Sequence, residues 1–337
     1  MIDYNLIRHV HLEISSRCNA RCPDCPRNFF GVNIVDNYPQ CDLRIDDIKK
    51  IFPPVFVRQL QDILICGNYG DFVTAQDGVD AVEYFFHENP HIRINISTNA
   101  SARPDIWPRL ARTPAEVEFR IDGLRDTHHL YRVGTDWDLV ISNARTFIQN
   151  GGRAVWHMIV FDHNQHQVEQ CREMSQQLGF ARFDITQQDP GVRNRMPVFD
   201  RERQLSYTIG GYDSDTDFEY LRFHHFERDH WLDAEYSKPA KNIRCKAIGN
   251  GTSHAIYVAS NGEVYPCCWL GFYPLTNDTR LSNLQIRGMI HENNAREHGI
   301  QHATQWFSAI ENTWRIPTVQ QGRIDMCNST CGDCGQS

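Results

Sequence analysis

Strand-like and helix-like segments alternate through the first two-thirds of the chain. The strand-like segments are 9–14, 62–66, 91–98, 117–122, 153–161 and 182–186. Residues 77–89, 136–150 and 166–178 carry apolar side chains at helical spacing, and glycines follow the last two, as is common where helices stop. This alternation predicts an α/β fold with a parallel sheet or barrel. Six β-α units are two fewer than a closed TIM barrel contains, so we expect an open, partial barrel.

In the strand-like segments 9–14, 91–98, 117–122 and 182–186, apolar and polar residues alternate. In 117–122, for example, positions 117, 119 and 121 are apolar and positions 118, 120 and 122 are charged. Successive side chains of a strand point to opposite faces, and a strand buried on both faces would be apolar throughout. The pattern therefore predicts one face packed under helices and one polar face that lines a ligand-holding lumen. An antiparallel sheet with one solvated face is the alternative.

The chain contains 12 cysteines, and Cys18, Cys22 and Cys25 follow the first strand in the run C-N-A-R-C-P-D-C. The first residues show no secretory signal, so we expect a reducing compartment, where clustered cysteines usually bind metal. Three thiolates can hold three irons of a 4Fe-4S cluster and leave the fourth iron open to a small ligand. A zinc loop with a distant fourth ligand, or thiols with a structural role, are the alternatives.

The motif and its position resemble those of the radical S-adenosylmethionine (radical SAM) superfamily, in which C-x3-C-x2-C follows a first strand. The resemblance implies a partial (β/α)6 TIM-like barrel and a 4Fe-4S cluster on Cys18, Cys22 and Cys25, whose open iron site binds SAM. It also implies that the reduced cluster cleaves SAM to a 5′-deoxyadenosyl radical, which abstracts hydrogen from a substrate. Asp24 departs from the family pattern, because the residue before the third cysteine is usually apolar and lies near the adenine.

Two further positions match the family's G-G-E segment, which receives the SAM amine. Gly70 and Asp71 occur in C-G-N-Y-G-D, directly after the second strand. The resemblance assigns to Gly70 a close backbone approach and to Asp71 a carboxylate that accepts from the ammonium group. Tyr69 and Phe72 differ from the family's residues, and a plain β-turn is the alternative.

Residues at the ends of the next two strands match other SAM-binding positions of the family. Ser97 and Asn99 lie where the third strand ends, where family members contact the ribose and carboxylate of SAM. Arg120 and Asp122 end the fourth strand, although the family often has serine in place of Arg120. Arg132, in Y-R-V-G-T, is a candidate clamp for a carboxylate, with a solvated arginine as the alternative.

A second set of cysteines occurs towards the carboxyl terminus. Its members are Cys245, Cys267, Cys331 and Cys334. Cys267 closes a predicted hairpin, 255–259 and 263–265. The set resembles the twitch form of the SPASM extension, which implies one auxiliary 4Fe-4S cluster. Cys327 could replace one of these ligands, and Cys268 or Cys327, if not bound to a cluster, could donate a hydrogen atom to the substrate. A zinc knuckle with four cysteines is the alternative.

These observations together predict three segments. Residues 1–195 form the radical SAM partial barrel, 196–240 a connector, and 241–337 a small cysteine-rich α+β domain of the twitch/SPASM type. Within the last segment, residues 284–293 and 305–311 are expected to be helical.

Charge and hydropathy restrict the partners that such a chain can have. It has 42 acidic and 34 basic residues and a formal charge of −8, which argues against nucleic acid or an anionic membrane as a partner. No apolar run approaches the roughly 18 residues of a membrane span. We therefore expect a cytoplasmic protein.

The resemblance favours peptide modification by epimerisation, crosslinking or oxidation, with a reducing electron donor such as flavodoxin or ferredoxin. The sequence begins directly at the first strand, which leaves no room for the leader-binding domain of many peptide-modifying members. Radical dehydrogenation of a small polar molecule, such as a sugar or an aminocyclitol, is therefore one alternative. A zinc-binding scaffold without enzymatic activity is the other.

Overall fold

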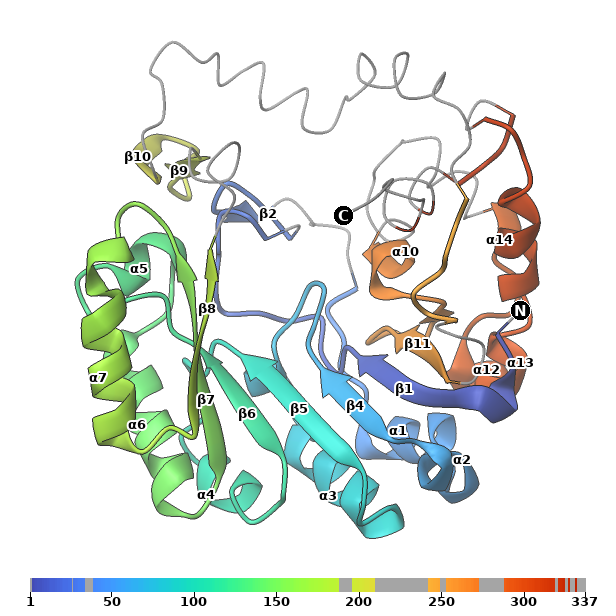
Figure 1. Cartoon of the computed structure of the whole chain (residues 1–337), viewed down its shortest axis with the longest axis horizontal. Coiled ribbons are helices and arrows are strands. Elements are labelled where there is room, and N and C mark those ends of the chain that lie inside the picture. Colours follow the sequence, from blue (N-terminus) through green and yellow to red (C-terminus); the bar gives the residue numbers. More distant parts are fainter. Residues whose placement is uncertain are drawn as a thin grey trace. The chain divides into compact units, whose positions relative to one another are not determined.

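The computed structural model describes residues 2–25, 27–33, 39–187, 196–209, 242–248, 253–272, 288–318, 321–324, 327 and 331 (Figure 1). The chain divides into two compact units. The sheet unit comprises residues 12–45 and 62–215, and the terminal unit comprises residues 1–11, 46–61 and 216–337. No helix in the described ranges is long and apolar enough to cross a bilayer.

The sheet unit contains, among its described residues, five parallel strands that are hydrogen-bonded in chain order. They are β4 (Asp62–Ile65), β5 (Arg93–Thr98), β6 (Glu116–Arg120), β7 (Arg153–Val160) and β8 (Arg182–Gln187). Each overlaps a strand expected from the sequence, and the α/β class is confirmed. The antiparallel alternative is wrong for these strands, because every pairing between them is parallel.

Helices connect the successive strands and cover one face of this sheet (Figure 1). They are α3 (Gly78–Glu88), α4 (Trp107–Leu110), α5 (His128–Tyr131), α6 (Trp137–Gln149) and α7 (Val168–Leu178). The Asp136 carboxylate accepts from Asp138 N and Leu139 N, which caps the first turn of α6. Gly179 ends α7 with φ +86, a left-handed conformation that glycine adopts without steric cost.

Aromatic side chains fill the space between this sheet and its helices. Phe119 of β6 is fully buried, with ring centroids 5.2 Å from Trp107 and 5.9 Å from Phe147. On the opposite face of β6, Glu118 and Arg120 are partly exposed. The predicted division into an apolar face under helices and a polar face is thus confirmed for this strand.

Two short hairpins complete the described part of the sheet unit. The first, β2 (Asn28–Phe29) and β3 (Val32–Asn33), follows the three amino-terminal cysteines. The second, β9 (Met196–Phe199) and β10 (Leu205–Ile209), begins the segment expected to be a connector. Phe199 N donates to Phe30 O at 2.9 Å, so the second hairpin is joined to the turn of the first.

The terminal unit contains most of the chain's remaining strands and helices. They are β1 (Ile7–Leu12) and α1 (Ile45–Ile51), each with one end residue in the sheet unit, and α2 (Pro54–Gln59), β11 (His254–Val258), β12 (Val264–Tyr265), α10 (Cys268–Phe272), α12 (Ala295–His298), α13 (Ile300–Ala303) and α14 (Phe307–Thr313). β11 and β12 pair antiparallel, which confirms the predicted hairpin. Gly262 lies in the turn of this hairpin with φ +88.

The prediction of a helix over 284–293 is wrong after residue 289, because residues 290–293 are not helical.

Phe119→Ala tests the importance of the aromatic layer. Loss of this fully buried ring should lower the free energy of unfolding by about 3–5 kcal/mol. Ile185→Ala is the matched control, because Ile185 is also a strand residue but is 41% exposed, and its loss should cost about 1 kcal/mol or less. Urea unfolding followed by circular dichroism measures both. Equal losses would contradict the assignment of the buried face.

Candidate functional site

The three amino-terminal cysteines lie on one loop that starts after β1. Cys22 belongs to a buried apolar cluster with Tyr131 and Phe161, and Cys18 and Cys25 pack against the same cluster. Cys25 N donates to Cys22 O at 3.1 Å, which forms a tight turn between two of the cysteines. The loop therefore brings together all three thiols that the sequence singled out.

The environment of these thiols suits a bound cation. Burial raises the pKa of all three thiols, and neighbouring thiols contribute to the rise for Cys18 and Cys25. The two effects together raise the pKa of Cys25 to about 12. Three adjacent thiolates are therefore unfavourable without positive charge, and a metal that binds thiolates offsets both effects. Three soft sulfur donors on one loop fit an iron–sulfur cluster, and they also fit zinc.

Two nitrogen donors point at the sulfur atoms from other parts of the sheet unit. Asn99 Nδ2 lies 3.7 Å from Cys18 Sγ, and Arg132 Nη1 lies 3.7 Å from Cys22 Sγ. Arg132 Nε also donates to Asp122 Oδ2 at 2.6 Å, and Asp122 Oδ1 accepts from Ile159 N at 2.7 Å. Such N–H donors stabilise negative charge on sulfur and hold metal-binding side chains in place. The Arg132 side chain is thus only 13% exposed and lies beside the cysteine loop, so the solvated alternative is wrong.

Asp71, predicted to receive the SAM amine, is partly buried and bonded to groups of the protein. Its carboxylate accepts from Val73 N at 3.0 Å, from Asn99 N at 2.7 Å and from the Thr98 hydroxyl. These bonds join the turn after β4 to the end of β5. The contact of Asp71 with SAM stays a prediction.

Gly70 provides a close backbone approach, and its neighbour there is the cysteine loop. A Cβ at this position would lie 1.8 Å from Ser15 O, so only glycine fits. The turn is also held by Glu13, whose Oε1 accepts from Tyr69 N at 2.6 Å and from Gly70 N at 3.2 Å. Glu13 is fully buried, and the sequence analysis did not select it, although it lies on the polar side of the first strand.

A row of polar side chains crosses the sheet at the carboxyl ends of its strands. Arg120 Nε donates to Ser97 Oγ at 2.8 Å, and Arg120 Nη2 lies 2.6 Å from Glu118 Oε1. Glu118 Oε2 lies 3.2 Å from His157 Nδ1, and His157 Nε2 lies 2.8 Å from Thr186 Oγ1. Ser97 and Arg120 were selected from the sequence. Glu118, His157 and Thr186 were missed as site residues, although the polar alternation of the strands marks Glu118 and Thr186.

The protonation of Glu118 follows from its neighbours in this row. Burial acts to raise the pKa of Glu118, but the hydrogen bond to His157 and the charge of Arg120 outweigh it, so the pKa is lowered. Glu118 is therefore a carboxylate at neutral pH. Asp24, by contrast, is exposed on the cysteine loop.

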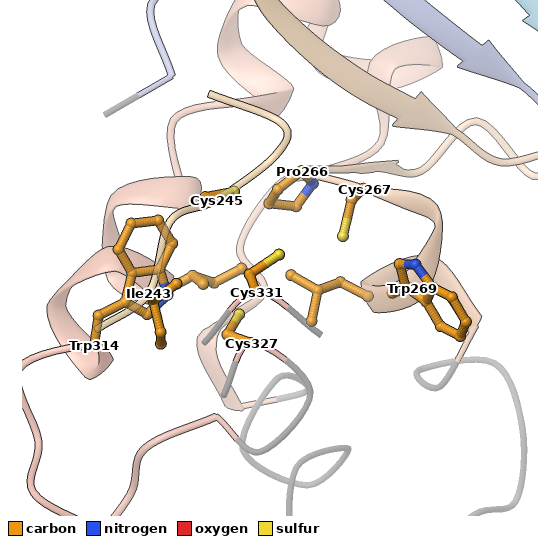
Figure 2. A pocket seen from close by; sticks show the side chains of 10 residues that line it. Ile243, Cys245, Pro266, Cys267, Trp269, Trp314, Cys327 and Cys331 are labelled. Atoms are coloured by element: carbon orange, nitrogen blue, oxygen red, sulfur yellow. The ribbon is translucent and has the colours of Figure 1, made fainter. Parts of the chain in front are cut away.

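Four of the other cysteines line one pocket in the terminal unit. They are Cys245, Cys267, Cys327 and Cys331 (Figure 2). Trp269 and Trp314 are among the other residues of its lining, which is otherwise apolar. Figure 2 shows the sulfur atoms of Cys267, Cys327 and Cys331 directed toward a common space. Cys334 lies outside the described residues, and Cys268, at the start of α10, does not line the pocket.

The thiols of this pocket influence one another. A hydrogen bond with Cys245 lowers the pKa of Cys331 to about 6, and the same bond raises the pKa of Cys245. Burial raises the pKa of Cys267 to about 12. Four thiols around one apolar space match the ligand number of an iron–sulfur cluster or a structural zinc site.

Searches of protein-family models and of curated proteins found no match. Among solved structures, the chain is similar to Streptococcus suis SuiB bound to S-adenosylmethionine, with a TM-score of 0.53, 13% identity, and coverage of 96% of this chain and 77% of that chain. The chain has the fold of the radical SAM enzymes. SuiB bound to its precursor peptide SuiA is also similar, with a TM-score of 0.52, 14% identity and 82% of this chain covered. That alignment spans 62% of the SuiB chain.

A second protein with the radical SAM fold has a similar structure. It is anSMEcpe with bound AdoMet and the Cp18Cys peptide, with a TM-score of 0.50, 15% identity, and coverage of 88% of this chain and 80% of that chain. At such identities the likeness extends to the fold.

Arg132→Met tests the ion pair beside the cysteine loop. This change leaves the fully buried Asp122 carboxylate without its cation and should lower the free energy of unfolding by about 3–5 kcal/mol. Arg125→Met is the matched control, because Arg125 and Asp138 form an ion pair that is largely exposed, and its loss should cost about 1 kcal/mol or less. Urea unfolding measures both variants. A loss for Arg132→Met as small as that of the control would be inconsistent with this geometry.

His128 should make the stability depend on pH. Its Nδ1 accepts from Asp122 N at 3.1 Å, and burial lowers its pKa to about 4 from 6.5. Between these values the unfolded chain binds a proton that the folded chain does not, so the free energy of unfolding falls as pH decreases from about 6.5 to 4. In the wild-type chain the free energy of unfolding, measured with urea, should differ between pH 7.5 and pH 5.0. The metal-free His128→Asn variant should lose part of this difference. His91→Asn, at an exposed histidine, should retain it, and retention by both variants would refute the prediction.

Proposed function

We propose that this chain is a radical SAM enzyme that holds a 4Fe-4S cluster on Cys18, Cys22 and Cys25. The observation that carries the proposal is the loop of three adjacent, largely buried thiols in a radical SAM fold, with N–H donors directed at two of the sulfurs. The cluster, once SAM is bound, would supply the electron that cleaves SAM to a 5′-deoxyadenosyl radical for hydrogen abstraction. The protein contributes the thiolates, the compensating charge of Arg132 and a partly buried environment.

The SAM-binding positions form part of this proposal. Asn99 supports it best, because its side chain contacts both Cys18 and Asn19, at 3.7 Å and 3.0 Å. Gly70 and Asp71 hold the adjacent turn, and Ser97 and Arg120 lie in the polar row. In our proposal Asp122 acts through Arg132, and Asp24 contributes its backbone at the exposed rim of the loop.

We propose further that the terminal unit holds an auxiliary 4Fe-4S cluster in a domain of the twitch/SPASM type over residues 241–337. The sulfur atoms around the apolar pocket support Cys245, Cys267, Cys327 and Cys331 as its ligands (Figure 2). In this assignment Cys327 takes the place that the sequence analysis gave to Cys334. Cys268 is then the remaining candidate for a hydrogen donor.

We propose a peptide as the substrate, modified by epimerisation, crosslinking or oxidation. The support is that SuiB was solved with the precursor peptide SuiA and anSMEcpe with the Cp18Cys peptide. The polar row of Ser97, Glu118, Arg120, His157 and Thr186 favours a second candidate, the dehydrogenation of a small polar molecule. The product mass separates epimerisation, which leaves it unchanged, from oxidation, crosslinking and dehydrogenation, each of which removes hydrogen.

Metal content tests the cysteine assignments. Protein purified and reconstituted without oxygen should contain about eight irons and eight sulfides per chain, as expected for two 4Fe-4S clusters. Two variants should each retain about half of this iron and sulfide, because each loses one cluster. They are the Cys18→Ala, Cys22→Ala, Cys25→Ala triple variant and the Cys245→Ala, Cys331→Ala double variant.

Cys41→Ala is the matched control, because Cys41 belongs to neither set, and it should retain the full iron content. Zinc without iron would overturn the enzymatic proposal and favour the scaffold alternative. About four irons, retained by the double variant, would leave the first cluster and remove the auxiliary one.

A further inference from the structure

A group of metal-binding side chains lies between Cys268 and Cys327 in sequence and contains no cysteine. Glu292, His298 and His302 each offer one ligand atom, and these three atoms lie within 4.8 Å of one another. Glu292 Oε2 is 2.5 Å from His302 Nε2, and the rings of His298 and His302 have centroids 5.4 Å apart. We propose that these three side chains form a binding site for a divalent transition-metal ion, with Zn²⁺ as the ion of best fit.

The two histidines stand on short helices whose positions are fixed by packing. His298 ends α12 and His302 lies in α13, with Gly299 between the helices. The side chain of Asn294 caps α12 by accepting from Arg296 N at 2.9 Å. Ala295 and Ile300 anchor the two helices in the core. The imidazoles are therefore held near each other before an ion binds, which reduces the entropy lost on binding.

The segment that carries Glu292 is also anchored, through the strand β12. Val264 N donates to Asn293 O at 2.9 Å, and Val264 O accepts from Trp306 Nε1 at 3.2 Å. Glu292 itself has φ +49, a left-handed conformation that few residues other than glycine adopt. A metal ion would thus connect two anchored segments, the one that pairs with β12 and the one that forms α13.

The donor set determines the class of ion. Two imidazoles and one carboxylate, with a fourth position open to water, are a common set for Zn²⁺. Imidazole ligands disfavour Mg²⁺ and Ca²⁺, which prefer oxygen donors. The side chains of Glu292, His298 and His302 are 60%, 32% and 43% exposed, so water reaches the fourth position and the ion exchanges with solvent. The Glu297 carboxylate lies 3.7 Å from His298 Nε2 and can orient that ring.

Calorimetric titration of the cluster-loaded protein with Zn²⁺ under anaerobic conditions tests the site. The wild-type chain should bind one more equivalent than the His298→Ala, His302→Ala double variant. Glu292→Gln should weaken this binding about tenfold or more, because it replaces a charged ligand with a neutral one. His91→Ala removes an exposed histidine of the sheet unit and should leave the titration unchanged.

A second readout separates loss of the site from loss of structure. Zn²⁺ should raise the unfolding temperature of the wild-type chain, because an ion that binds only the folded state stabilises it, and should not raise that of the double variant. The variants should keep the wild-type circular dichroism and iron content. Identical zinc titrations for the wild-type chain and the double variant would overturn the proposal. It would equally be overturned if the wild-type chain bound no zinc beyond its cysteine sites.

Discussion

The largely buried ion pair between Arg132 and Asp122 is the interaction on which the candidate site depends. Arg132 donates to Asp122 and reaches the sulfur of Cys22, and Asp122 accepts from the backbone of Ile159 at the end of β7. A buried carboxylate needs a partner because desolvation of an unpaired charge is very costly. The pair therefore fixes the cysteine loop to the ends of β6 and β7, and it places positive charge where thiolates form.

The arrangement of the sheet explains why the chemistry lies where it does. Apolar side chains of β5 and β6 are buried under the helices, and the polar residues of the same two strands gather on the other face. Glu118 and Arg120 on β6 and His157 on β7 bond to one another across neighbouring strands. Parallel strands end at one edge, so this polar row and the residues that follow the strands lie on the same side as the cysteine loop.

Much of the fold could be predicted from the sequence, because it follows from local patterns. Alternation with a period of two supported the strands β5, β6 and β8, and helical spacing with a glycine stop gave α6 and α7. The hairpin of β11 and β12 followed from Ser-Asn-Gly, since glycine at position 262 supplies the positive φ of its turn. The helix expected over 284–293 failed because the contacts of Asn293 with β12 take over from helical spacing after residue 289.

The partners of the site residues depend on distant contacts and could not be predicted in the same way. The family pattern suggested that Asp71 receives a ligand's amine, yet its described bonds go to Val73, Thr98 and Asn99. The spacing of the last cysteines left open whether Cys327 replaces one of the four predicted ligands. Cys327 lines the apolar pocket with Cys245, Cys267 and Cys331, a grouping that the sequence alone could not give.

The central claim is that the thiols held by the Arg132–Asp122 pair support cleavage of SAM. Its most direct test is to incubate the reconstituted protein with SAM and dithionite without oxygen and to quantify 5′-deoxyadenosine and methionine. The account predicts equal amounts of both products, their loss in Cys22→Ala and their retention in Cys41→Ala. Iron-loaded protein that forms no 5′-deoxyadenosine, or Cys22→Ala protein that still forms it, would contradict the account.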